Sequence, residues 1–197
     1  MRKSDLFDLI ANVRTIAPDE KLIVAGSQAA YAVTNYLPEI ARKSVECDFL
    51  FASGRADLRE KVNKEMGVLT EYQDEHGYYA DAVGLATIVL PSGWEERLRP
   101  LYGDNETVVA DCIDIYDLAI SKLVAGRDKD LEFLESAFAS ELIQASEFLE
   151  RSILVSSKVE NDVLKDRLTR LVKTLESNRI HYDLIGQVRM FMAKLPL

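Results

Sequence analysis

The sequence predicts an α+β fold in which a mixed sheet is flanked by helices and followed by an α-helical C-terminal extension. Up to about residue 115, short apolar runs typical of buried strands alternate with segments of helical periodicity. Beyond that point only helical patterns occur, and no internal repeat is visible. We therefore expect a core domain over 1–115 and an α-helical region over 116–197 that packs on this core.

The first elements follow from apolar spacing and from the residues that interrupt it. Apolar residues at helical spacing predict a first helix that ends before Pro18. An apolar run predicts a buried strand over 22–25, and small and aromatic residues over 28–37 favour a packed helix. The next strand is expected over 45–51, where apolar and acidic residues alternate.

The remaining elements of the core domain are expected to be short. A helix is predicted over 56–66, and turn residues within 72–80 indicate a hairpin. A further strand is expected over 85–90, one or two helical turns over 94–98, and a last strand over 108–113.

The C-terminal region reads as helices only. A helix is predicted over 118–125. Ser157 and Glu160 have the spacing of a capping box and are expected to open a helix with an apolar stripe that includes Val163 and Leu168. This amphipathic helix could pack on the core, form a homodimer or receive a partner protein.

Composition excludes several classes of protein. A net charge of −9 argues against broad adhesion to nucleic acid. No apolar run approaches the roughly 20 residues that span a bilayer, so we expect a soluble, cytoplasmic protein with no membrane partner. Cys47 and Cys112 lie in predicted strands and are expected to be buried free thiols.

Two short motifs in the core domain could bind metal and phosphate. Glu46 and Asp48 are two residues apart on a strand, so both project from one face and could hold Mg²⁺ or Mn²⁺. Gly26 and Ser27 follow a strand and precede a helix, where backbone N–H groups attract phosphate oxygens. Each motif also has an ordinary interpretation, namely an acidic strand face in water and a serine that caps a helix.

A third group of candidate residues lies in the helical region. Lys122 could reach a triphosphate as a point charge, Asp130 could orient a water, the nucleotide or the metal shell, and Arg127 could brace either. The alternative is that Arg127 and Asp130 form an i,i+3 ion pair, while Lys122 is a solvated surface residue.

Together these motifs resemble the minimal nucleotidyltransferases of the DNA polymerase beta superfamily, and most closely the AbiEii-type group. The similar segments are Gly26-Ser27, Glu46-x-Asp48, Lys122 with the Leu-Val-Ala that follows it, and Arg127 to Asp130. The resemblance implies a nucleotidyltransferase-like fold and transfer of NMP from an NTP to an acceptor. Relatives more often have Asp where this chain has Glu46.

The resemblance also implies further residues and partners. Superfamily members often carry a third carboxylate on a later strand that acts as base; Asp81 is the candidate here, and Asp74 is a poorer one in a predicted turn. The resemblance to AbiEii-type proteins implies a toxin with an antitoxin partner and an RNA acceptor such as tRNA, while a protein or small-molecule acceptor stays open. The rival interpretation is an inactive module of this fold that senses nucleotides or holds a partner.

Overall fold

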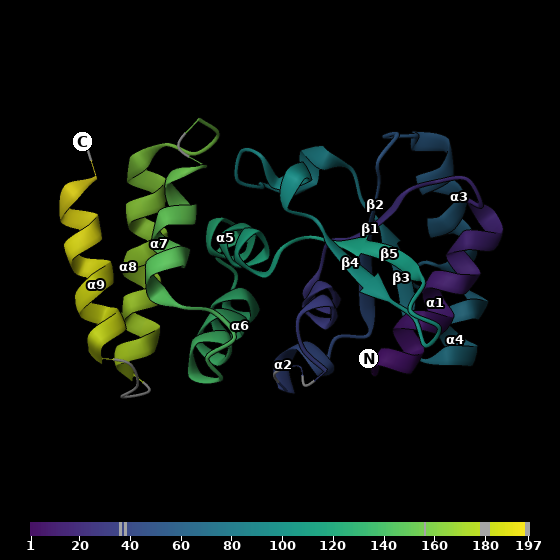
Figure 1. Cartoon of the computed structure of the whole chain (residues 1–197), viewed down its shortest axis with the longest axis horizontal. Helices are drawn as coiled ribbons and strands as arrows, with labels where there is room; N and C mark the ends of the chain where they lie inside the picture. Colours follow the sequence, from purple (N-terminus) through teal and green to yellow (C-terminus); the bar gives the residue numbers. More distant parts are fainter. Residues whose placement is uncertain (36, 38, 156, 178–181, 196–197) are drawn as a thin grey trace. The chain divides into compact units, whose positions relative to one another are not determined.

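The computed structural model describes residues 1–35, 37, 39–155, 157–177 and 182–195. The chain has an α+β fold with a five-stranded mixed sheet, flanking helices and a run of C-terminal helices, as the sequence predicts (Figure 1). It divides into two compact units. The first unit comprises Met1–Ile88 and Glu95–Asp114, and the second comprises Val89–Trp94 and Ile115–Leu197.

The first unit is built on one sheet with the strand order β3-β2-β1-β5-β4. The central strand β1 pairs antiparallel with β2 and parallel with β5. β3 is parallel to β2, and β4 is antiparallel to β5. The strands are β1 (Leu22–Val24), β2 (Glu46–Phe51), β3 (Tyr79–Ala82), β4 (Arg99–Tyr102) and β5 (Val108–Cys112).

Helices cover both faces of this sheet. α1 (Lys3–Ile16) and α3 (Ala56–Met66) pack on one face, and the 3₁₀ helix η1 (Ser27–Ala32) packs on the other (Figure 1). α1 and β2 contribute fully buried apolar residues to the core, among them Leu6, Leu9 and Phe49. The free thiols Cys47 and Cys112 are both buried, as predicted. Burial raises the pKa of Cys112 to about 12, so this thiol stays protonated at neutral pH.

Three of the expected elements are wrong. The predicted hairpin over 72–80 is instead α4 (Glu71–His76) followed by β3, because Thr70 caps the helix and Gly77 ends it with a left-handed φ of 76°. The expected strand over 85–90 is only η2 (Leu85–Thr87), and the expected helix over 28–37 is the shorter η1.

Other elements of the first unit agree with the sequence or were missed. The helix over 56–66 is α3, and the helical turn near Trp94 is η3 (Trp94–Arg97). β4 was not predicted, since it is short, contains Pro100 and lies at the sheet edge, where a residue without N–H is tolerated. α2 (Glu39–Arg42) is a single turn.

The second unit contains only helices among its described elements, as predicted. Their buried side chains form a separate core in which the rings of Phe138 and Phe148 meet edge to face at 5.2 Å. The α8 stripe includes Leu168 but not Val163, which is 40% exposed. The helices are α5 (Ile115–Ala125), α6 (Asp128–Ala139), α7 (Ala145–Ile153), α8 (Asn161–Ser177) and α9 (Tyr182–Lys194).

Within the part of the chain that the structure describes, no helix combines the length and apolar character that crossing a membrane requires.

Candidate active site

The turn after β1 lies directly against the acidic strand β2. The Ala25 N–H donates to the Asp48 carbonyl oxygen at 2.9 Å, which holds the end of β1 beside β2. A Cβ added at Gly26 would overlap the Asp48 carboxylate oxygen Oδ2 and lie 2.9 Å from Cγ. The Gly26 φ of −88° is open to any residue, so the need for glycine here is one of space. The sequence-predicted Gly26 and Asp48 are therefore brought into contact.

Three carboxylates share one face of β2 and β3. The parallel register pairs Asp48 with Asp81 and Glu46 with Tyr79. Along both strands the burial alternates, because Glu46, Asp48 and Asp81 are half-buried while Cys47 and Ala80 are fully buried. We call Glu46, Asp48 and Asp81 the acidic face. Asp81 thus lies beside Asp48 on the neighbouring strand.

Tyr79 belongs to the same face and was not identified from the sequence. Its hydroxyl donates to Oε2 of Glu46 at 3.0 Å, which fixes the position of that carboxylate. Burial, this hydrogen bond and the nearby acidic charges raise the pKa of Tyr79 to about 12, so it stays a donor. The signal that could have found it is its place two residues before Asp81 on a strand.

The electrostatics of the acidic face favour a bound proton or cation. Burial, followed by the negative charge of Glu46, raises the pKa of Asp81 above its ordinary value of 3.8. Carboxylates crowded on one face repel each other unless a proton or a cation compensates their charge. The acidic face can therefore gain stability from a cation.

The residues fit Mg²⁺ as a partial site. Among the described residues, no group of three His, Cys, Asp or Glu side chains has the geometry of a metal cage. Mg²⁺ is commonly held by one or two carboxylates together with substrate phosphates and water. Glu46 and Asp48 could supply the two carboxylates. The close contact at Gly26 leaves the Asp48 carboxylate next to the turn where phosphate oxygens would be expected.

Ser27 opens η1 directly after Gly26. Its side chain is half-buried, and the Ala29 N–H donates to the Gly26 carbonyl oxygen at 2.9 Å to form the first turn. The next side chain, Gln28, is fully buried and donates through Nε2 to the Ala41 carbonyl oxygen at 3.0 Å. The turn is therefore tied to α2 and held in place.

The third predicted group lies in the second unit and forms a closed ion-pair cluster. Asp130 is fully buried, and its carboxylate accepts hydrogen bonds from Arg127 Nε at 2.7 Å and from Lys122 Nζ at 3.3 Å. Its carboxylate also accepts from the Arg127 backbone N–H at 3.3 Å, which caps the start of α6. The expected i,i+3 pair is present.

Lys122 is not the solvated surface residue that the sequence suggested. Its side chain is only 13% exposed, and its ammonium group lies 4.8 Å from the centre of the Phe133 ring. Burial alone would raise the pKa of Asp130, but the hydrogen bond from Arg127 and the charge of Lys122 outweigh it, so this pKa lies below the ordinary value.

The predicted site residues thus form two groups. Gly26, Ser27 and the acidic face belong to the first unit, and Lys122, Arg127 and Asp130 belong to the second. Asp74, the poorer candidate for a third carboxylate, lies on the exposed surface of α4 rather than in a turn.

Comparison with known proteins gives one family. The model of a family described as nucleotidyltransferase of unknown function (DUF6036) matches residues 4–183, a range that includes both groups of candidate residues. No curated protein and no solved structure matches the chain. The resemblance to nucleotidyltransferases is confirmed, while the AbiEii-type assignment stays a prediction. Because the match extends over most of the sequence, the chain belongs to the DUF6036 family of nucleotidyltransferases of unknown function.

Proposed function

We propose that this chain transfers a nucleoside monophosphate from an NTP to an acceptor hydroxyl, with Mg²⁺ or Mn²⁺ as cofactor. The observation that carries the proposal is the position of Asp48, which contacts Gly26 of the turn after β1 and pairs in register with Asp81 of β3. The family match over residues 4–183 supports the same reaction class. A phosphate-binding turn, two metal-binding carboxylates and a third carboxylate are the parts this chemistry needs.

In this proposal each residue of the first unit has a distinct role. Glu46 and Asp48 would hold the metal, which would supply polarisation of the α-phosphate and stabilisation of the departing pyrophosphate. Ser27 and the backbone N–H groups of the turn donate to phosphate oxygens. Tyr79 orients Glu46 through its hydrogen bond.

Asp81 is the proposed general base. The acceptor oxygen forms a bond to the α-phosphorus, the bond to the bridging oxygen of pyrophosphate breaks, and the acceptor proton passes to Asp81. A pKa above the ordinary value makes this carboxylate a stronger base toward the acceptor proton. Two further roles stay predictions from the sequence. Lys122 and Arg127 would contact the triphosphate, and Asp130 would orient a water, the nucleotide or the metal shell.

The test is calorimetric titration of each NTP into the protein with and without Mg²⁺. We expect Mg²⁺-dependent binding that weakens at least about 10-fold in Glu46→Gln and in Asp48→Asn, because each change removes a metal-binding carboxylate. Asp74→Asn is the control, since it also removes one acidic charge from the first unit, but from an exposed position on α4. It should bind as the unchanged protein does.

A different result would favour the rival function. If no NTP binds in Mg²⁺ or Mn²⁺, or if Asp74→Asn weakens binding as much as Asp48→Asn, the transferase proposal fails. The chain would then be an inactive module of this fold that senses another nucleotide or holds a partner.

The acceptor we propose is RNA, with tRNA as the first candidate. The protein would then act in the cytoplasm as the toxin of a toxin–antitoxin pair. The support is the resemblance of the Gly26, Glu46 and Lys122 segments to AbiEii-type proteins. The proposal allows three further partners. They are a protein acceptor, an antitoxin that binds α8, and a second copy of the chain in a homodimer. Labelled NTP incubated with total RNA and with a cell lysate distinguishes the two acceptor classes.

A further inference from the structure

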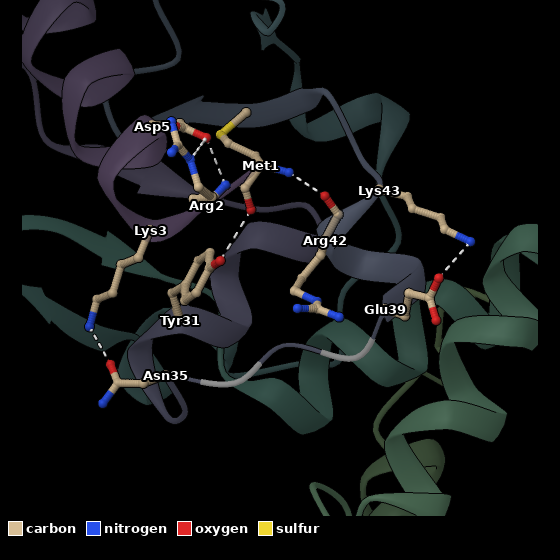
Figure 2. Close-up of a pocket in the computed structure, with 9 residues that line it drawn as sticks. All are labelled: Met1, Arg2, Lys3, Asp5, Tyr31, Asn35, Glu39, Arg42 and Lys43. Atoms are coloured by element: carbon tan, nitrogen blue, oxygen red, sulfur yellow. Dashed lines mark hydrogen bonds and ion pairs between the residues drawn. The ribbon is translucent and has the colours of Figure 1, made fainter.

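A cavity of about 560 Å³ lies in the first unit, beside the start of α1, the end of η1 and α2 (Figure 2). Four of its lining side chains are cationic and two are acidic, and the Met1 ammonium group of the lining is held by the Ser44 carbonyl oxygen at 2.8 Å. This balance is the reverse of the whole chain, whose net charge is −9. The cationic residues are Arg2, Lys3, Arg42 and Lys43, and the acidic ones are Asp5 and Glu39.

Two of the four cations are neutralised inside the cavity. The Arg2 guanidinium donates to Asp5 at 2.7 Å, and the Lys43 ammonium donates to Glu39 at 2.9 Å. Both pairs can be followed as dashed lines in Figure 2. Both acidic side chains of the cavity are therefore already in ion pairs, and the lining has no further carboxylate for the remaining cations.

The other two cations, Lys3 and Arg42, form no ion pair with the described carboxylates of the cavity lining. The Lys3 ammonium donates to the neutral Asn35 amide oxygen at 2.9 Å. The Arg42 guanidinium has no hydrogen-bond or ion-pair partner among the residues that the structure describes. Two unneutralised cations at one concave site raise the local concentration of anions, and a guanidinium fork matches phosphate oxygens.

This cavity is distinct from the candidate active site. It is lined by Tyr31 and Asn35, at and beyond the C-terminal end of η1, whereas Gly26 and Ser27 are at the start of that helix. No residue of the acidic face lines it. A ligand held by Arg42 and Lys3 would therefore be a second ligand, separate from an NTP at the turn.

We propose that this cavity binds a small phosphorylated ligand, with Arg42 and Lys3 as the contacts to its phosphate groups. The inference goes beyond nucleotidyl transfer and does not depend on it. The volume lies within the range of about 300–1,000 Å³ that is usual for small-molecule sites. The acidic net charge disfavours a long nucleic acid, whose many phosphates would meet repulsion elsewhere on the surface.

The probe is inorganic tripolyphosphate, titrated calorimetrically into the full chain in EDTA, so that no metal-dependent site contributes. We expect one site whose affinity falls about 10-fold in Arg42→Gln and in Lys3→Gln and further in the double variant, because each removes a charged phosphate contact. Lys61→Gln and Lys64→Gln on α3 are the matched controls, since both side chains are exposed and neither lines the cavity. These controls should bind normally.

Several results would overturn the proposal. Absence of binding, or binding that Arg42→Gln and Lys3→Gln leave unchanged, removes the site. Binding lost in Ser27→Ala but kept in the cavity variants locates the anion at the turn of the candidate active site instead. Arg42-dependent binding of a single-stranded RNA without binding of tripolyphosphate replaces the small ligand by RNA. The metal-dependent NTP titration is a separate measurement, so either proposal can fail alone.

Discussion

Two aspartates, Asp81 in the first unit and Asp130 in the second, carry the same side chain in opposite electrostatic surroundings. Burial and the negative charge of Glu46 raise the pKa of Asp81. Asp130 is more deeply buried, yet the hydrogen bond from Arg127 and the charge of Lys122 lower its pKa despite that burial. The fold therefore disfavours the charge of Asp81 and favours that of Asp130.

This difference separates a carboxylate available for chemistry from one that stabilises the fold. Asp130 closes the start of α6 and neutralises two cations, so its bonds are already made within the second unit. Asp81 is held half-buried and near the negative charge of Glu46, at a cost in free energy that a proton or a bound cation would relieve. Groups held in this way are enriched at functional sites, which makes the acidic face the better candidate.

The largest effect should come from removing the Asp130 charge. We expect Asp130→Asn to lower the free energy of unfolding by about 3 kcal/mol, because it removes the buried charge that Lys122 and Arg127 both contact. Urea denaturation measures this change. Glu132→Gln is the control, since it removes an exposed acid from the same helix and should change stability by less than about 0.5 kcal/mol. A loss below about 1 kcal/mol in Asp130→Asn would mean that the cluster is not structural.

Gly26→Ala should have the next largest effect, and should combine lost stability with lost binding. The added Cβ would overlap the Asp48 carboxylate, so we expect a loss of about 1–3 kcal/mol in the free energy of unfolding. Displacement of Asp48 should also abolish Mg²⁺-dependent NTP binding in calorimetry. The control is Gly186→Ala in α9, where a Cβ meets no atom within 4 Å and removal of a helical glycine should stabilise by about 0.5–1 kcal/mol.

The two glycine variants are compared at equal temperature and denaturant. If Gly26→Ala unfolds and binds as the unchanged protein does, the Asp48 carboxylate can move freely, and the close contact has no role in the site.

The sequence allowed the motifs of the acidic face to be found but not their assembly. Alternation along a strand was enough to predict that Glu46 and Asp48 share a face. That Asp81 lies beside Asp48 depends on the parallel pairing of β2 with β3, which no local pattern in the sequence reports. Tyr79 was missed for the same reason, since its role depends on the register opposite Glu46.

The errors in the fold also have physical causes. A glycine after polar residues signals both a hairpin turn and the left-handed end of a helix, and at Gly77 it is the latter. In the second unit, the ordinary alternative for Lys122 was a solvated surface residue, whereas packing of α6 on α5 brings Asp130 and Phe133 to it. Such tertiary contacts are absent from any single helix.

The smallest effect, and the most direct test of the comparison, is the pH dependence of stability. The folded pKa of Asp81 is raised, so between the ordinary value of 3.8 and that raised value the folded protein binds more protons than the unfolded chain. Its contribution to the free energy of unfolding is therefore lost as pH rises through the folded pKa. For Asp130 the folded pKa is lowered, so its contribution is present above 3.8 and is lost as pH falls through the folded pKa.

Urea denaturation of Asp81→Asn and Asp130→Asn from about pH 3 to about pH 7 should then give difference curves of opposite slope relative to the unchanged protein. With rising pH, the free energy of unfolding of Asp81→Asn should increase relative to that of the unchanged protein, and that of Asp130→Asn should decrease. Slopes of equal sign would show that the fold shifts the pKa of both carboxylates in the same direction.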